Sequence, residues 1–322
     1  TMLEGSRKLD PGCSLLVQKE EVTTRRYWDI RFPDSEAPQP SFTDACAAFR
    51  ELLTASIERR LMADVPLGVF LSGGIDSSTL VALLSRIKKA EEISTYCVGF
   101  SEPSFDESQY SRAVAEQFGT RHNERILDAD SLAQLLPEII AKLDEPLADG
   151  SLLPTYLLSK FAREQLVVAL GGDGGDELCL GYPTFYAHRV ATLFSRLPNP
   201  FRRVVTAMVE RLPVSTRNWS LDYQAKRFIQ GMEYDRFSRH FVWIAGTPPR
   251  DQDQLLTSEY RPRDAEEVLR PVLDGIRRSE PRDDFDLLTY VYSKLYLSAD
   301  ILTKVDRASM MNSLEVRAPF LD

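Results

Sequence analysis

Residues 67–78 read LGVFLSGGIDSS, an apolar run followed by a glycine-rich turn. The apolar run over 67–71 predicts a buried strand, and a helix is expected over 77–88. Between them lies a turn with two glycines and flanking serines. Glycine lets a backbone approach a ligand closely, and the amides at a helix N-terminus favour an anion. The turn over 72–76 is therefore a candidate phosphate site. The alternative interpretation is a plain strand-to-helix turn with a serine cap.

The acid inside this turn restricts the kind of phosphate site. Asp76 carries a negative charge beside the anion, so it fits a phosphate only when Mg²⁺ bridges the two. The lysine of an ordinary P-loop is missing, because the pattern GxxxxGK[ST] does not occur here. The stretch predicts a loop that binds a phosphate group together with magnesium.

Strands and helices alternate around this loop. Alternation of this kind predicts an α/β fold, in which a twisted parallel sheet has helices on both faces. After about residue 185 the sequence becomes aromatic and arginine-rich at helical spacing, which predicts a mostly α-helical region. The further expected strands cover 15–17, 27–30, 93–100, 122–127 and 167–170, and the further expected helices follow Ser41 or Thr43 and cover 106–118, 130–143 and 154–164.

A second loop, GGDGGDELCLGY over 171–182, also follows a strand directly. Ligands bind at the carboxyl ends of the strands in open α/β sheets. Two separated carboxylates, Asp173 and Asp176, would share a metal ion or divide metal binding and proton transfer between them. The alternative is a solvated acidic turn or a calcium loop, although the EF-hand spacing is absent.

A third segment, KVDRASMMNSLEVRAPFLD over 304–322, gathers Lys304, Asp306, Arg307 and Arg317. Cations there would neutralise a leaving pyrophosphate as its negative charge builds up. The alternative is a helix face with surface salt bridges.

Composition excludes several classes of protein. The chain has 322 residues, with 39 Lys and Arg against 48 Asp and Glu, a formal net charge of −9. An acidic chain without a basic arm argues against a nucleic-acid partner. No apolar run approaches the roughly 18–20 residues of a membrane span, so no membrane partner is expected. Four scattered cysteines without a CxxC pair argue against zinc and fit a reducing, cytoplasmic setting.

Taken in this order, the three segments resemble the synthetase domain of the glutamine-hydrolysing asparagine synthetase family, within the ATP pyrophosphatase (PP-loop) superfamily. The resemblance implies an adenine nucleotide α-hydrolase-like fold over 41–322 that is incomplete at its C-terminal end. It also implies that residues 1–40 are a remnant of an N-terminal glutaminase domain and its linker. The blocks that match are LGVFLSGGIDSS, TYCVGF, DESQYSRAVAEQFGTRH, LDEPLADGSLLPTYLLSKFAR, GDGGDEL and DRASMMNSLEVRAPFLD.

The same resemblance implies ATP and Mg²⁺ as cofactors. Asp76 and Asp176 match the acids that hold the metal ion. The positions that match ATP and pyrophosphate contacts are Phe70, Leu71, Ser72, Gly73, Gly74, Asp76, Ser77, Ser78, Val98, Gly171 and Gly172.

Other matched positions concern the reacting groups. Asp173 matches an acidic position near the reacting centre, where it would orient or deprotonate the incoming amine. Lys304 and Arg307 fall in the basic segment that the family uses on the phosphates. Asp149 and Ser151 lie where the family reads its acceptor substrate.

The implied activity is that of an ATP-dependent amidotransferase. It adenylates a carboxylate and then forms an amide with ammonia from glutamine, with aspartate as the default acceptor and asparagine as the product. The alternatives are a synthetase for another carboxylate, β-lactam synthetase-like or polysaccharide-linked, a tRNA-modifying PP-loop enzyme, and a non-catalytic scaffold. The expected partners are the carboxylate acceptor and glutamine or ammonia, and a homodimer is an open option.

Overall fold

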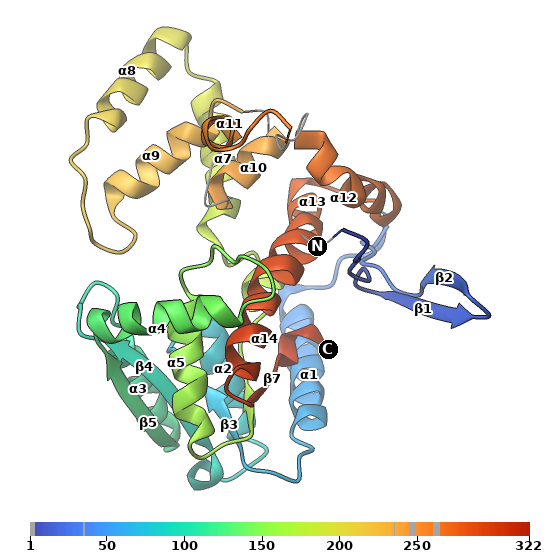
Figure 1. Cartoon of the computed structure of the whole chain (residues 1–322), viewed down its shortest axis with the longest axis vertical. Coiled ribbons are helices and arrows are strands. Elements are labelled where there is room, and N and C mark those ends of the chain that lie inside the picture. The colour runs from blue at the N-terminus through green and yellow to red at the C-terminus, as the bar shows by residue number, and fades with distance from the viewer. Residues whose placement is uncertain (1–3, 35, 235, 245–248, 260–264) are drawn as a thin grey trace. The chain divides into compact units, whose positions relative to one another are not determined.

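A five-stranded parallel sheet forms the centre of the first of two structural units (Figure 1). The computed structural model describes residues 4–34, 36–234, 236–244, 249–259 and 265–322, so residues 1–3 and 35 of the predicted segment 1–40 lie outside it. The first unit comprises Thr1–Cys179 and Arg278–Asp322, and the second comprises Leu180–Arg277.

The sheet has the strand order β5-β4-β3-β6-β7, and every neighbouring pair is parallel. The α/β prediction is confirmed, and so are the four strands expected within this sheet. Its strands are β3 (Leu67–Phe70), β4 (Ser94–Phe100), β5 (Arg121–Leu127), β6 (Val168–Leu170) and β7 (Glu315–Arg317). Neighbouring strands β3 and β6 pair with Val69 opposite Leu170, so the loops that follow them begin side by side.

Helices cover both faces of the sheet, as predicted (Figure 1). Because side chains alternate along a strand, Val69 and Leu71 point to the face that α1 and α2 cover. Phe70 points to the other face, where it packs near Tyr96 of β4 and Phe161 of α5. The helices of this unit are α1 (Phe42–Arg60), α2 (Ile75–Leu84), α3 (Ser108–Phe118), α4 (Ala129–Lys142), α5 (Leu152–Arg163), α6 (Gly175–Cys179), α13 (Asp284–Val291), the π-helix η2 (Tyr292–Ile301) and α14 (Leu302–Met310).

The N-terminal part forms an antiparallel hairpin of β1 (Cys13–Gln18) and β2 (Glu21–Arg26). The prediction of a strand over 27–30 was wrong. Lys19 and Glu20, both with positive φ, make a two-residue turn that starts the second strand at Glu21. Tyr27 and Trp28 then donate backbone hydrogen bonds to Gly12 O and leave the ladder.

The second unit is helical over its described residues, as predicted. Inside it, α8 lies beside α9, and α9 packs against α10, where Phe228 stacks on Trp243. Its helices are α7 (Pro183–Ser195), α8 (Asn199–Glu210), α9 (Leu221–Gly231), α10 (Arg236–Ile244), α11 (Pro249–Leu255) and most of α12 (Ala265–Ser279).

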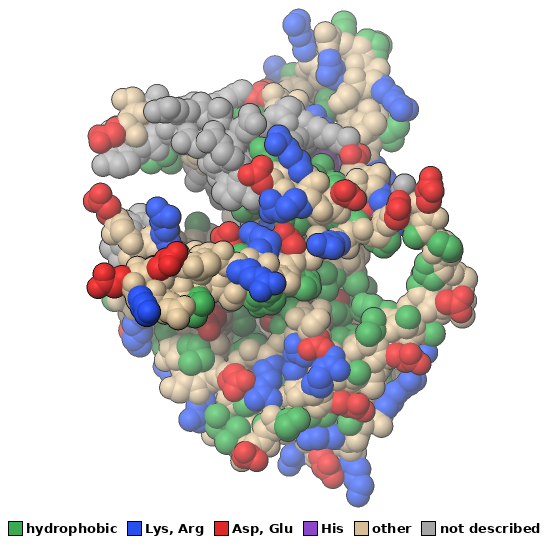
Figure 2. Space-filling view, turned by 90° about the vertical axis from the view of Figure 1, so that its right-hand side faces the viewer, with side chains coloured by type: hydrophobic (Ala, Val, Ile, Leu, Met, Phe, Trp, Pro, Cys, Tyr) green, Lys and Arg blue, Asp and Glu red, His purple; other side chains and the backbone are tan. Residues whose placement is uncertain are grey.

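Two surface observations bear on possible partners. None of the described helices is long and apolar enough to cross a membrane. On the face that Figure 2 shows, Lys and Arg side chains are interspersed with Asp and Glu.

Candidate active site

The first predicted loop turns sharply between β3 and α2. Gly73 has φ +84°, and a Cβ there would lie 2.5 Å from the backbone of Tyr110 and Ser111 at the start of α3. Only glycine fits this position. The helix begins at Ile75, two residues earlier than predicted, so Asp76 lies in its first turn.

The hydroxyls of this loop are organised around Gly74, which is the N-cap of α2. Gly74 N donates to Ser72 Oγ at 3.2 Å, and Ser77 Oγ donates to Gly74 O at 3.2 Å. Ser78 Oγ is buried without a hydrogen-bond partner among the described residues. The cap is thus a glycine, and the alternative interpretation as a serine-capped turn does not hold.

The second loop packs directly onto the first. A Cβ on Gly175 would lie 2.3 Å from Asp76 Cγ, and one on Gly172 would lie 3.2 Å from Asp76 Cβ. Gly174 has φ +93°, and Gly171 N donates to Arg317 O of β7 at 2.8 Å. The glycines therefore let two loops, about 100 residues apart in sequence, meet around one carboxylate.

This meeting point is crowded with negative charge. Burial and the charge of Asp176 raise the pKa of Asp76 to about 6. Burial raises the pKa of Asp176 as well. Burial also raises the pKa of Asp173, although Lys304 opposes that effect. Among the described residues no group of three His, Cys, Asp or Glu side chains is arranged around a metal position, so Asp76 and Asp176 stand as a pair.

Lys304 links the basic segment to the predicted acceptor loop. Its Nζ lies 3.1 Å from Asp149 Oδ2 and donates to Ser151 Oγ at 2.9 Å. Ser151 in turn donates its hydroxyl and its amide to Asp149 Oδ1, at 2.7 and 2.8 Å. Burial acts to raise the pKa of Asp149, but the charge of Lys304 and these hydrogen bonds outweigh it and hold the pKa below its usual value.

Arg307 lies one helical turn further along α14 and is engaged differently. It forms a bidentate ion pair with Asp144, at 2.8 and 2.7 Å, and its Nη1 lies 2.6 Å from Asp306 Oδ2. The hydrogen bonds from Arg307 lower the pKa of Asp144 to about 2. The structure thus joins Lys304, and not Arg307, to the Asp149 and Ser151 pair.

The remaining predicted positions lie in the sheet itself. Phe70 and Val98 are half-buried against the core around Tyr96. Leu71 is buried, and its amide donates to Tyr96 O at 2.9 Å. Phe70 and Leu71 lie at the end of β3 that leads into the first loop, and Val98 lies on the neighbouring strand β4.

Tyr296 and Asp300 of η2 are not among the site residues predicted from sequence. Burial and the charge of Asp300 raise the pKa of Tyr296 to about 12. Burial and the charge of Asp149 raise the pKa of Asp300. The π-helical run of ten residues leads straight into α14 and Lys304, and π-helical turns are frequent at functional sites. Asp300 lies four residues before Lys304, and this spacing on a helix could have indicated that the two side chains share one face.

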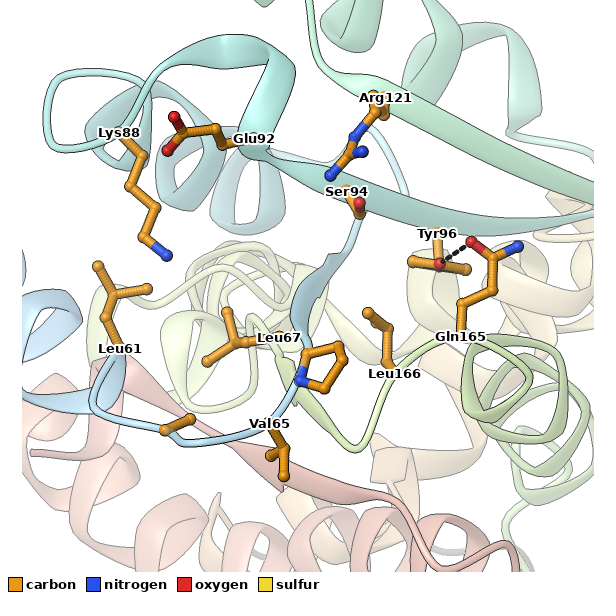
Figure 3. Close-up of a pocket in the computed structure, with 12 residues that line it drawn as sticks. Leu61, Val65, Leu67, Lys88, Glu92, Ser94, Tyr96, Arg121, Gln165 and Leu166 are labelled. Atoms are coloured by element: carbon orange, nitrogen blue, oxygen red, sulfur yellow. Dashed lines mark hydrogen bonds between the residues drawn. The ribbon is translucent and has the colours of Figure 1, made fainter.

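A cavity of about 390 Å³ lies at the opposite, amino ends of the strands (Figure 3). Leu67, Ser94 and Leu166 line it, together with Lys88 and Arg121. The hydroxyl of Tyr96 donates to Gln165 Oε1 at 3.1 Å on its wall. The glycine loops and their acids lie at the carboxyl ends, where ligands bind in open α/β sheets, so the candidate site is placed there.

Comparison with known proteins identifies the family of the chain. A family model described as asparagine synthase matches residues 48–322. The chain belongs to the asparagine synthase family. The matched range contains both glycine loops and Lys304, so the loops that meet in the structure are part of the family domain.

Relatives in this family are similar along the chain. It is 32% identical over its whole length to a putative glutamine-hydrolysing asparagine synthetase of Mycobacterium tuberculosis, covering 48% of that protein. It is 27% identical over 98% of its length to asparagine synthetase 1 of Bacillus subtilis, again covering 48%. A protein named amidase chry2 from Gibberella zeae is 30% identical over 58% of the chain and 30% of its own length. The chain spans about half the length of the asparagine synthetases it matches.

Proposed function

We propose that this chain supplies the ATP-dependent synthetase part of an amide-forming ligase whose acceptor is aspartate. The observation that carries the proposal is the meeting of the two glycine loops around Asp76, at the carboxyl ends of β3 and β6. Membership of the asparagine synthase family supports the same reaction.

The loop between β3 and α2 would hold the phosphates of ATP. The N-cap of α2 is Gly74, which has no side chain. An anion can therefore approach the backbone amides of the first turn closely. Ser78 Oγ has no partner among the described residues and is a donor left for a ligand. Because both loops and Lys304 are fixed by packing and hydrogen bonds, their dipoles and charges need little reorganisation during the reaction.

Asp76 and Asp176 fit a magnesium ion, because hard carboxylate oxygens are the ligands that this ion prefers. Burial raises the pKa of both acids, and at Asp76 the charge of Asp176 adds to the effect, so a bound cation would stabilise their ionised forms. When bound, Mg²⁺ would neutralise part of the charge on the phosphates of ATP.

In the first step a carboxylate oxygen of the acceptor attacks the α-phosphorus, and the bond between the α-phosphorus and its bridging oxygen breaks. Pyrophosphate leaves and an acyl-adenylate remains. Lys304 would place its ammonium beside the developing charge, while Asp149 and Ser151 hold it in position. The same Asp149 carboxylate would accept hydrogen bonds from the ammonium group of aspartate.

In the second step ammonia attacks the acyl carbon, loses a proton, and AMP leaves with both electrons of the broken bond. Asp173 would take that proton, because burial raises the pKa of its carboxyl group and so makes it a stronger base. Glutamine is the proposed source of ammonia in the whole protein.

A second candidate is a ligase for a different carboxylate. Relatives named amidases, chry2 of Gibberella zeae and chyE of Penicillium rubens, are 30% and 26% identical to parts or all of this chain. Under this second function the adenylation residues keep the same proposed roles, and only the acceptor carboxylate differs.

Exchange of labelled pyrophosphate into ATP, measured with a panel of carboxylic acids, separates the two candidates. Exchange that depends on aspartate supports the first. Exchange with another acid, and none with aspartate, supports the second. If no acid supports exchange while the protein still binds MgATP, both are wrong.

A further inference from the structure

The side chain of Asp29 binds the helical run that leads to Lys304. Its Oδ1 lies 2.7 Å from Lys294 Nζ, and the side chains of Asp29 and Lys294 are only 12% and 10% exposed. Tyr290 donates its hydroxyl to both carboxylate oxygens of Asp29, at 3.1 and 3.2 Å. Tyr290 lies in α13 and Lys294 in η2, so one carboxylate of the N-terminal segment contacts two successive helices of the first unit.

Further contacts hold the N-terminal segment against these helices. Lys294 Nζ lies 5.4 Å from the ring centre of Trp28 and 5.6 Å from that of Tyr290, within the range of cation–π attraction. Phe32 N donates to Ser279 O at 3.2 Å. The segment around Asp29 is therefore fixed by its backbone and by an aromatic ring as well as by its carboxylate.

The environment of Asp29 keeps its carboxylate ionised. Burial acts to raise the pKa of Asp29, but the hydrogen bond and charge of Lys294 outweigh it and hold the pKa below its usual value. Arg26 and Arg278 add positive charge, at 3.6 and 4.0 Å from Oδ2. A largely buried ion pair adds little net stability over a well-packed apolar pair, and the role best attested for such pairs is the selection of one conformation.

The conformation at stake is the π-helical register of η2. π-Helices appear mostly as single-turn bulges, whereas η2 extends over ten residues. At its end Thr303 Oγ1 donates to Ser298 O, five residues earlier, at 3.1 Å. A π-helix has more residues per turn than an α-helix, because its hydrogen bonds span five residues and not four. A change of η2 to α-helical register would therefore rotate α14 about the helix axis.

Such a rotation would turn Lys304 away from its partners. α13, η2 and α14 follow one another as one helical run (Figure 1), and Lys304 lies about 15 Å beyond Lys294 at 1.5 Å per residue. Lys304 Nζ contacts Asp149 and Ser151 at 3.1 and 2.9 Å. The ion pairs of Lys294 and Lys304 therefore form together only when the register between them is that of η2.

We propose that Asp29 is a positioning residue, which fixes the π-helical register of η2 through Lys294 and so directs Lys304 to Asp149. The consequence for catalysis rests on the role proposed above for Lys304, whereas the fixed register concerns only the structure of the helical run. Asp29 lies outside residues 48–322, which the family model matches. The proposal thus gives the segment before the family domain a part in shaping the acceptor loop's cation.

Hydrogen exchange followed by mass spectrometry tests the fixed register without any measurement of activity. In Asp29→Asn and in Lys294→Met, amides of η2 and of α14 should exchange about tenfold faster or more. Asp10→Asn is the matched control, because it makes the same change in the same segment but breaks an exposed pair with Arg26. Faster exchange confined to η2, no change in either helix, or an equal change in the control would overturn the proposal.

Acid-dependent pyrophosphate exchange tests the consequence for the reaction. Asp29→Asn should lower kcat by about ten- to a hundredfold, because a small displacement of Lys304 is costly. The affinity for MgATP should stay unchanged, since the loop between β3 and α2 keeps its own contacts. Asp29→Asn/Lys294→Met should lose no more than either single variant, because the two side chains act as one pair. Additive losses would overturn the route through Lys294.

Two results separate this positioning role from the proposed function. If the unaltered protein shows no exchange of pyrophosphate with any acid, the proposed function is wrong, and hydrogen exchange in η2 and α14 still decides the role of Asp29. If Asp29→Asn keeps its kcat while its melting temperature falls, the ion pair serves stability alone and the positioning role is wrong. Circular dichroism checks that each variant folds.

Discussion

The ammonium of Lys304 and the carboxylate of Asp149 form a largely buried ion pair, with Nζ 3.1 Å from Oδ2. Lys304 also donates to Ser151, which lies 153 residues away in sequence. This pair joins α14 to the loop before α5, so one cation belongs to both the proposed phosphate site and the proposed acceptor site. Lys304 would therefore act in both phosphate binding and acceptor binding, and this dual role can be tested.

Lys304→Gln should lower the rate of acid-dependent pyrophosphate exchange by about a hundredfold or more, because a charge aimed at the leaving group is lost. The variant should also lose roughly 3 kcal/mol in free energy of unfolding, since Asp149 is left without its partner. Steady-state exchange and urea unfolding measure the two effects. Lys142→Gln is the control: it breaks an exposed pair with Glu138 and should change neither quantity appreciably. An exchange rate in Lys304→Gln equal to that of the control would remove Lys304 from the mechanism.

Arg307→Gln should have a much smaller effect than Lys304→Gln. Arg307 is already engaged by Asp144 and Asp306, so we expect an exchange rate within about tenfold of the unaltered protein. Asp144→Asn should give a similar result, because it breaks the same pair from the other side. If Arg307→Gln abolishes exchange while Asp144→Asn does not, the arginine contacts the phosphates directly.

Gly175→Ala should disrupt the meeting of the two loops. The added Cβ would lie 2.3 Å from Asp76 Cγ, so the carboxylate must move. A displacement of about 1 Å at a reacting site costs on the order of a hundredfold in rate. Gly119→Ala at the end of α3 is the control, because a Cβ at that glycine would meet only Ala90 Cβ, at 3.7 Å, and touches neither loop. The measured kcat/KM for ATP should fall for Gly175→Ala and stay unchanged for the control. An equal fall in both variants would show that the close approach of Gly175 to Asp76 is not required for activity.

Part of this architecture could be predicted from sequence. The strands β3, β4 and β6 are apolar runs that end at glycine or serine, and local patterning is enough to find them. The three-residue strand β7 escaped prediction, because its existence depends on pairing with β6 rather than on its own sequence. The ion pair between Arg307 and Asp144 could not be predicted from sequence either, because only the tertiary fold brings these two residues together.

The stability of the second unit should depend on pH through His240. This ring is fully buried beside His188, with Nδ1 3.1 Å from Nε2 of that residue. Burial, and then the proximity of His188, lower the pKa of His240 from its usual 6.5 to about 3. At pH values between about 3 and 6.5, His240 is protonated in the unfolded chain but neutral in the folded protein. Stability is therefore complete above about pH 6.5 and falls by roughly 1.4 kcal/mol per pH unit below it.

Urea unfolding followed by tryptophan fluorescence at pH 7.5 and pH 5.5 measures this effect. His240→Phe should reduce the difference between the two pH values by about 1 kcal/mol. Asp222→Asn, which alters another buried polar group of the same unit, serves as a control for general changes. An unchanged pH dependence in His240→Phe would show that this ring is not the titrating group.

Pyrophosphate exchange in Asp76→Asn tests whether the two glycine loops form the adenylation site, because Asp76 is the residue around which both loops meet. Asn keeps the size of the side chain and removes its charge. We predict aspartate-dependent exchange in the unaltered protein and a loss of about a thousandfold in the variant, with folding unchanged. Exchange that continues at the original rate in Asp76→Asn would contradict the account, and so would cleavage of ATP to ADP and phosphate by the unaltered protein.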